Sequence, residues 1–382
     1  MKTVLISGER FYSIEEANLI KEIFLKASFT FEAFGYDYIN LSHFEPYEYQ
    51  ELSFGEKAKE AITFKDSSTK ETFGLRLDFT TQVVRTISNL KNLKFPEKLY
   101  YFGSVFSLDR KGFEKLQTGI ELIGINNLEA DVEVIQVLVE FLRTLEIKNV
   151  KVILSHAGIV RKLAKDDNQL LKAFFERDVE KLKKIFGNDV NKVLRISDSH
   201  EILEILEKYS LDKERETLKG IGEKLKELGI SFAYDLCEVR HFPYYTGVIF
   251  EIYELKYHRA VAGGGRYDNL STLFGKNLPA TGGTVYLERL IDILPKAISL
   301  KDFFIIDKSE KKLGKQLANV LRGKGKKVAV ELVEREVEDS VIYAFEKGYR
   351  EILLVDDKKL KVFYTPKEYV IMTVKEFLKL IQ

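Results

Sequence analysis

Cysteine and histidine are scarce in this chain of 382 residues. The one cysteine, Cys237, excludes an internal disulfide and a cysteine-rich metal site. The five histidines show no spacing typical of zinc ligands. We therefore predict no metal site, and the sequence indicates no cofactor.

An excess of one charge and a long apolar run are also missing. Lysine and arginine number 60 and aspartate and glutamate 59, for a formal net charge of +1. Nucleic-acid-binding proteins usually carry a basic excess, so this balance argues against tRNA binding as the main activity. No run approaches the ~20 apolar residues of a membrane span, and the segment from Met1 to Arg10 lacks the apolar core of a signal peptide. We expect a soluble, cytoplasmic protein.

The first half of the chain predicts a mixture of helices and strands. Hydrophobic residues make up 45% of the chain, which is enough for the cores of two or three domains. Ser13 and Glu16 form a capping-box pattern that predicts a helix reaching Phe34. Further along, the apolar spacing predicts strands at Tyr36–Leu41, Leu75–Leu77, Leu99–Phe106 and Gln117–Ile125 and a helix at Leu128–Leu145. From about residue 158 to 229, leucine and charged residues dominate, which predicts a helical insert.

The second half returns to strands and ends in a distinct unit. Strands are predicted at Ser231–Leu236 and Val248–Leu255, then a glycine-rich turn at Gly263–Asp268 and a helix at Leu287–Ile298. A β-α-β-α-β order follows, at Phe303–Ile306, Lys311–Arg322, Lys327–Leu332, Val337–Lys347 and Ile352–Val355. This order predicts a small α/β domain with a mostly parallel sheet. We therefore expect two domains, at residues 1–300 and 301–382.

Polar residues recur on the predicted strands. Residues i and i+2 of a strand share a face, so Asp78 and Thr80 are expected to point one way. Gln117 and Glu121 are expected to share a face of another strand, with Gly119 between them leaving room for a ligand. Taken singly, each residue is as well explained by an ordinary solvated strand. Together they predict a pocket.

The chemistry of these side chains suits an amino acid. Carboxylates and a hydroxyl bind an ammonium group, and a second carboxylate accepts a ring N–H from an imidazole. The planar guanidinium of Arg240 is suited to bidentate binding of a carboxylate. The alternative is that Tyr244 and Tyr245 belong to the core and the triple glycine to a simple turn.

Four segments together resemble the histidyl-tRNA synthetase family. Leu75–Thr80 is similar to its Leu-Arg-Pro-Glu-Gly-Thr strand, and Arg240–Gly247 to its first histidine-specific motif, Arg-Gly-Leu-Asp-Tyr-Tyr-Thr-Gly. Ala262–Asp268 resembles the second such motif, and Leu278–Leu290 resembles motif 3. The C-terminal unit resembles the family's anticodon-binding domain. The resemblance spans nearly the whole chain and is weakest in the helical insert.

The resemblance implies an α+β fold of the class II synthetase type, an antiparallel sheet flanked by helices and usually dimeric. By matching position, bound histidine would contact Asp78, Thr80, Gln117, Glu121, Arg240, Tyr244 and Tyr245. The same matching implies that the pocket is shaped by Gly264, Arg266 and Tyr267.

The part of the pattern that binds ATP departs from the family. Its Phe-Arg-x-Glu sequence becomes Phe106-Ser107-Leu108-Asp109 here, and removing such a phosphate contact costs about 3–4 kcal/mol at a transition state. The following loop, Arg110–Leu116, is shortened. Tyr286 stands where the family has a glycine that lets ATP pack closely. Arg289 is retained, either for a phosphate or for a structural ion pair.

A retained histidine pocket beside a degenerate ATP site is typical of the family's non-catalytic branch, the regulatory subunits of ATP phosphoribosyltransferase. The resemblance then implies no catalytic residues in this chain, L-histidine as the ligand, and a short catalytic subunit as partner. It implies a homodimer within a hetero-oligomer and histidine feedback on the first step of histidine biosynthesis. An active or divergent histidyl-tRNA synthetase is the alternative, because the C-terminal unit is retained. A stand-alone histidine-binding or RNA-binding module is the third possibility.

Overall fold

A computed structural model describes residues 10–108, 112–165, 167–238, 244–296 and 301–381. The chain divides into two compact units, each considered by itself. The larger unit holds Met1–Ser13 and Leu19–Pro295, and the smaller holds Lys296–Gln382 together with Ile14–Asn18. None of the helices in the described ranges has the length and apolar character that a membrane span requires.

An eight-stranded sheet forms the centre of the larger unit, in the order β1-β5-β6-β11-β10-β9-β7-β8. Its six central strands pair antiparallel, and only the edge pairs β1–β5 and β7–β8 are parallel. The strands are β1 (Asp37–Tyr38), β5 (Glu97–Phe106), β6 (Glu114–Ile123), β7 (Val150–His156), β8 (Phe232–Tyr234), β9 (Val248–Glu254), β10 (Ala260–Arg266) and β11 (Ala280–Tyr286). The sequence predicted β5, β6, β8 and β9, but not β7 or β11.

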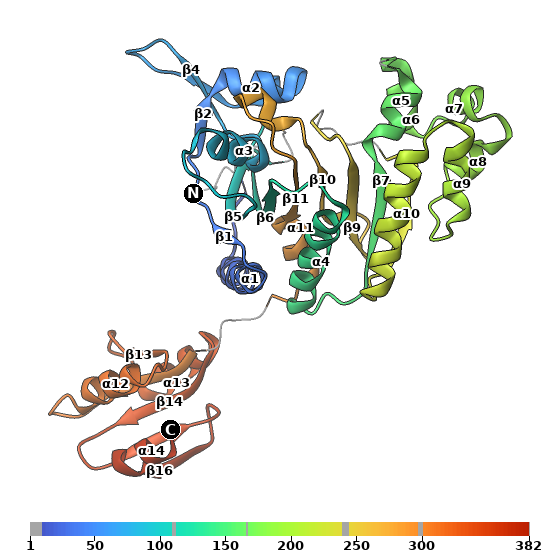
Figure 1. Cartoon of the computed structure of the whole chain (residues 1–382). Coiled ribbons are helices and arrows are strands. Elements are labelled where there is room, and N and C mark those ends of the chain that lie inside the picture. Colours follow the sequence, from blue (N-terminus) through green and yellow to red (C-terminus); the bar gives the residue numbers. More distant parts are fainter. Residues whose placement is uncertain (1–9, 109–111, 166, 239–243, 297–300, 382) are drawn as a thin grey trace. The chain divides into compact units, whose positions relative to one another are not determined.

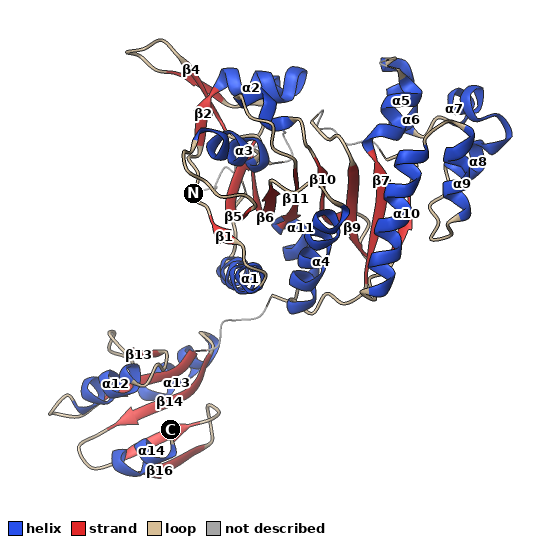
Figure 2. Ribbon diagram, viewed as in Figure 1, coloured by secondary structure: helices blue, strands red, loops and turns tan. Residues whose placement is uncertain are grey.

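Long helices cover one face of this sheet (Figures 1 and 2). They are α1 (Ile14–Ala33), α4 (Leu128–Thr144) and α10 (Asp212–Glu227), with the short α11 (Leu287–Ile293) beside them. α4 begins at Asn127, whose side chain accepts a hydrogen bond from the backbone N–H of Ala130. Phe31 and Phe141 pack with Ile120 in a fully buried core. This face therefore belongs to the core of the fold.

A smaller layer packs at the other face of β5 and β6. It contains α2 (Tyr47–Phe54), the 3-10 helix η1 (Gly55–Glu60), α3 (Phe79–Asn89), the 3-10 helix η3 (Leu270–Phe274) and a three-stranded sheet. That sheet has the order β2-β4-β3, with β2 (Phe44–Pro46), β3 (Thr63–Lys65) and β4 (Thr72–Leu75). The predicted strand at Leu75–Leu77 is wrong beyond Leu75, because Asp78 caps α3 and the chain turns into a helix there.

The helical insert consists of α5 (Ala157–Ala164), α6 (Asn168–Glu176), α7 (Val179–Phe186), η2 (Gly187–Asp189), α8 (Val190–Val193), α9 (Glu201–Lys208) and α10. It connects β7 to the parallel edge strand β8. Asp167 and Asp178 cap α6 and α7 by accepting backbone hydrogen bonds. The helical character predicted for residues 158–229 matches these elements.

The smaller unit is an α/β fold around a five-stranded sheet, β13-β12-β14-β15-β16. Its elements are β12 (Lys301–Asp307), α12 (Leu313–Gly323), β13 (Val328–Val330), α13 (Val337–Glu346), β14 (Tyr349–Val355), β15 (Leu360–Phe363), β16 (Tyr369–Met372) and α14 (Val374–Leu380). The first three strands are parallel, as the β-α-β-α-β order predicts. The antiparallel β15 and β16, and α14 after them, were not predicted.

Three further predictions are corrected. Gly263–Gly265 does not form a turn but lies inside β10, in the middle of the sheet. Glycine is needed at Gly264 because an added Cβ would lie 2.0 Å from the carbonyl oxygen of Gly282 on β11. The strand predicted at Tyr36–Leu41 is reduced to the two residues of β1, and α11 ends at Ile293.

Candidate functional site

The strand register defines which residues share the face opposite α4. Directly paired residues of antiparallel strands point to the same side. On β5, β6 and β11, in that strand order, three rows of paired residues share this side of the sheet. The first row is Leu99, Glu121 and Gly282, the second is Tyr101, Gly119 and Thr284, and the third is Gly103, Gln117 and Tyr286. We call this side the site face. The alternate residues, such as Tyr100 and Ile120, join the helix-covered core.

Glu121 lies at the centre of the site face and has 0% exposure. The hydroxyl of Thr80 donates to its Oε1 at 2.7 Å, and the hydroxyl of Tyr267 donates to its Oε2. Gly282 opposite Glu121 makes this position possible, because a Cβ there would lie 1.8 Å from Oε2. Burial raises the pKa of Glu121 to about 8, against the effect of its two hydrogen bonds.

Asp78 forms the second carboxylate of the site. Its Oδ1 accepts the backbone N–H of Thr81 at 3.1 Å, and its Oδ2 accepts the hydroxyl of Tyr244 at 3.3 Å. Burial raises the pKa of Asp78 as well. The prediction that Asp78 and Thr80 lie on a strand is wrong. Instead, both side chains are placed by the first turn of α3, which Asp78 caps.

Aromatic rings enclose the two carboxylates. The ring of Tyr244 lies 4.9 Å from that of Tyr245 and 5.8 Å from that of Tyr267. Tyr101 stacks on Phe79 at 4.2 Å, and its hydroxyl lies 2.6 Å from Oγ1 of Thr284. The aromatic walls lower the local polarity, which accounts for the raised pKa values of the carboxylates.

Gly119 has a different role from the one predicted. A Cβ at this position would lie 2.4 Å from the hydroxyl of Tyr101. The space beside Gly119 is therefore occupied by Tyr101 and is not left to a ligand. Sequence reasoning missed Tyr101, Gly282 and Thr284, although the Gly282-Gly283 pair was a signal for a close approach on β11.

The structure joins Asp78, Thr80, Glu121, Tyr244 and Tyr267 in one site. Burial raises the pKa of Asp78, and the charge of Lys57 acts in the opposite direction. The buried Glu121 and the half-buried Asp78 form a pair of carboxylates that suits a cationic ligand, since a cation stabilises their ionised forms. Gln117 lies half-buried on the same face, one row beyond Gly119, opposite Tyr286. Arg240 lies outside the described residues.

Arg266 and Gly264 belong to the other side of the sheet, contrary to the expectation that they line the pocket. The Arg266 Nε lies 3.1 and 3.0 Å from the two carboxylate oxygens of Asp131 on α4. Its Nη atoms donate to the carbonyls of Ile125 and Asn127 at 3.1 and 2.9 Å. Arg266 therefore fixes β10 to the start of α4, and of the three predicted pocket-shaping residues only Tyr267 touches Glu121.

Comparison with known proteins assigns the chain to a family. The family model described as histidyl-tRNA synthetase matches residues 8–290. The chain belongs to the histidyl-tRNA synthetase family.

Similar proteins within this family carry two different names. A protein of Aquifex aeolicus called ATP phosphoribosyltransferase regulatory subunit is 67% identical over 383 residues, covering 100% of both chains. A histidine–tRNA ligase of Methanocaldococcus jannaschii is 30% identical over 383 residues, covering 92% of each.

Solved structures confirm the predicted class II synthetase-like fold. A Bacillus halodurans protein described as an ATP phosphoribosyltransferase regulatory subunit/histidyl-tRNA synthetase has a TM-score of 0.80 at 24% identity, covering 94% of this chain and 99% of that one. Histidyl-tRNA synthetase of Nostoc has a TM-score of 0.81 at 18% identity, covering 100% and 99%.

The positions that match the family's ATP site hold other contacts. The backbone N–H of Ser107 donates to the carbonyl of Phe113 at 3.0 Å. Residues 109–111, which include the start of the shortened loop, lie outside the described ranges. The guanidinium of Arg289 lies 4.1 Å from the ring centre of Tyr286 and donates to the carbonyl of Ala260. Burial lowers the pKa of Arg289. In the described residues Arg289 is thus held by a ring and a carbonyl, rather than by the ion pair considered from sequence.

Proposed function

We propose that this chain is a non-catalytic regulatory subunit of ATP phosphoribosyltransferase that binds L-histidine and activates a short catalytic subunit. One observation carries the proposal. The side chains of the half-buried Asp78 and the fully buried Glu121 meet in one site, whereas the matched ATP positions hold Ser107 and Tyr286. The name of the Aquifex relative, at 67% identity over full length, supports this choice within the family.

Histidine fits the charges of the site. Its ammonium group would lie against Asp78, at the point where the Tyr244 hydroxyl meets Oδ2. Its imidazole N–H would be accepted by Glu121. Each carboxylate oxygen has two lone pairs, so Glu121 can accept this bond while Thr80 and Tyr267 remain bound. Gln117 and Tyr245 complete the proposed contacts, with Arg240 as the carboxylate partner.

Adenylation requires a positive charge on the α-phosphate, and the proposal includes its loss. Ser107 supplies no charge, and preorganised charges of this kind contribute about 3–4 kcal/mol at the transition state. Arg289 is already engaged by Tyr286 and Ala260. We therefore propose no catalytic residues in this chain and no aminoacylation or tRNA binding.

Regulation needs an assembly with two states. Histidine regulates only if it binds those states unequally. We propose a homodimer within a cytoplasmic hetero-oligomer, in which the catalytic subunit is active in one state and histidine favours the other. The first enzyme of histidine biosynthesis is the natural target of feedback by histidine.

The experiment is co-expression with a short catalytic subunit, followed by measurement of ATP phosphoribosyl transfer with and without millimolar histidine. We expect co-purification, activation and inhibition by histidine. Asp78→Ala is expected to relieve inhibition while the complex remains. A catalytic subunit that neither co-purifies nor becomes sensitive to histidine contradicts the proposal.

A histidyl-tRNA synthetase is the second candidate. The smaller unit, which resembles an anticodon-binding domain, and the 30% identical archaeal ligase favour it. Histidine-dependent pyrophosphate exchange separates the two candidates. Exchange clearly above background that is lost in Arg289→Ala would establish the synthetase instead.

A further inference from the structure

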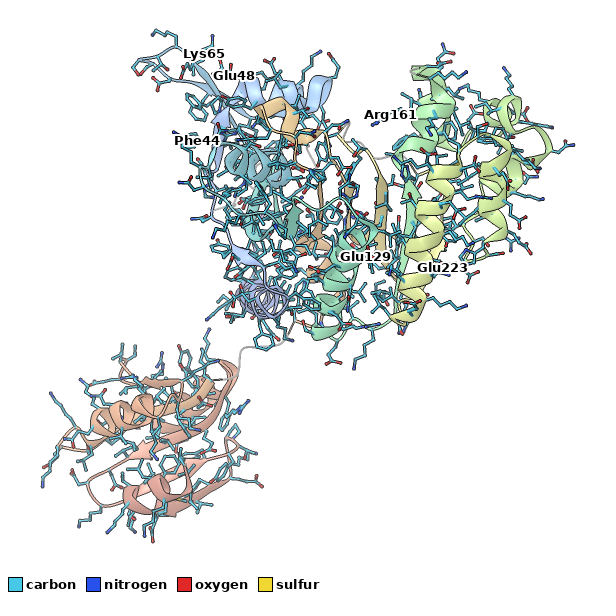
Figure 3. The ribbon with its side chains drawn as sticks, in the orientation of Figure 1. Phe44, Glu48, Lys65, Glu129, Arg161 and Glu223 are labelled. Atoms are coloured by element: carbon cyan, nitrogen blue, oxygen red, sulfur yellow. The ribbon has the colours of Figure 1, made fainter. Side chains whose placement is uncertain are left out.

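One side chain of the helical insert contacts the candidate site. Arg161 projects from α5 (Figure 3). Its Nη2 donates to the backbone carbonyl of Tyr245 at 2.7 Å. Tyr245 packs its ring 4.9 Å from that of Tyr244, whose hydroxyl donates to Asp78 at 3.3 Å. A short series of contacts therefore links the insert to a carboxylate of the site.

A cavity of about 460 Å³ lies beside this contact. Arg161 lines it from the insert, Tyr244 and Thr246 from the site, and Ser53 and Leu270 from α2 and η3. At the base of α5 the backbone N–H of Ala157 donates to the carbonyl of Gly247 at 2.9 Å. Arg161 and Tyr244 both line the cavity, so the guanidinium contacts the segment Tyr244–Tyr245 beside a space that neither side chain fills.

The insert also contacts the chain at residues that precede Tyr244 and Tyr245 in the sequence. Arg177, at the C-terminal end of α6, forms an ion pair with the buried Asp235, whose Oδ1 accepts the backbone N–H of Cys237 at 3.0 Å. Ser197 and Tyr234 form an isolated antiparallel bridge just before it. The chain is thus attached to the insert both at 234–237 and at Tyr245.

We propose that Arg161 is a positioning residue that couples the helical insert to the histidine site by fixing Tyr244 and Tyr245. The inference rests on the proposed histidine binding and names the element through which it acts. Coupling is reciprocal. If the insert fixes the tyrosines, then histidine bound against them stabilises the insert.

Calorimetry with L-histidine on the full chain tests the positioning role. We expect Arg161→Ala to weaken binding about five- to tenfold, since one hydrogen bond from a charged, exposed donor is lost. Arg161→Lys keeps a donor and should stay within about twofold of the wild type. Lys172→Ala is the matched control. Lys172 lies on α6 of the insert and pairs with the exposed Glu176 at 3.6 Å, where loss of a surface ion pair costs little. It should bind histidine as the wild type does.

Hydrogen exchange tests the coupling separately from affinity. At saturating histidine, backbone amides of α5 and α6 should exchange more slowly in the wild type and in Lys172→Ala. In Arg161→Ala this protection should be lost although the site is filled. A purely structural role for Arg161 would not remove it.

The outcomes separate the two proposals. A wild-type chain that binds no histidine refutes the proposed function and this inference with it. Normal binding by the wild type, with equal or tighter binding by Arg161→Ala or with unchanged protection of α5 and α6, refutes only the coupling through Arg161.

Discussion

The burial of Glu121 makes a quantitative prediction about pH. Its pKa is raised from 4.5 to about 8 in the folded chain, chiefly because its carboxylate is withdrawn from water. Between these two values the folded state binds more protons than the unfolded state. The free energy of unfolding therefore falls as the pH rises through this window. The stabilisation that comes from the proton kept on Glu121 in the folded state is fully present only below about pH 4.5.

The expected size of this change in the free energy of unfolding follows from the separation of the two pKa values of Glu121. Each unit corresponds to about 1.4 kcal/mol, so Glu121 should lower the free energy of unfolding by about 2–5 kcal/mol between pH 5 and 8. Glu121→Gln removes the titrating group and should remove this part of the slope. The exposed Glu48→Gln is the control and should follow the wild type.

Chemical denaturation at pH 5, 6.5 and 8 measures the effect, with circular dichroism following the unfolding of the wild type and both variants. The pH dependence of the wild type minus that of Glu121→Gln isolates the contribution of the carboxylate. Parallel curves for these two proteins would show that Glu121 is ionised in the folded state at all three values. The account of a desolvated carboxylate would then be wrong.

Three further predictions concern binding, stability and catalysis. Gly282→Ala and Gly283→Ala should each cost about 1–3 kcal/mol of stability by overpacking. Only Gly282→Ala should abolish histidine binding in calorimetry, because its Cβ would lie 1.8 Å from the Glu121 carboxylate. The Cβ of Gly283→Ala would instead lie 2.7 Å from Leu138, on the helix-covered side of the sheet. Arg266→Ala should lower stability in denaturant titration by about 3–5 kcal/mol, since Asp131 is left buried without its cation; a loss below about 1 kcal/mol would contradict that role. Ser107→Arg alone should show no histidine-dependent pyrophosphate exchange, because Arg289 and Tyr286 still hold each other; measurable exchange would mean that the matched ATP positions remain usable.

The sequence predicted long helices better than the elements around the site. The helix at Leu128–Leu145 and the helical insert follow an apolar period that depends on neighbouring residues alone. Asp78 was assigned to a strand, and only its hydrogen bond to Thr81 reveals it as a helix cap. Gly263–Gly265 was assigned to a turn because glycine is common in turns, yet it lies inside β10. The close approach that requires glycine there comes from Gly282, on another strand.

The sequence by itself determined the family, the α+β class and the residue types of the candidate site. These depend on motif order and on the chemistry of side chains such as Asp78, Glu121 and Tyr244. Only the tertiary structure decided which of them meet. Strand register places Glu121 opposite Gly282 and directs Arg266 to the helix side. The packing of the helical insert places Arg161 against Tyr245, 84 residues away along the chain. The alternation of apolar residues decides which face of a strand is buried, but the strand that pairs with it and the helix that packs against it come from distant parts of the chain.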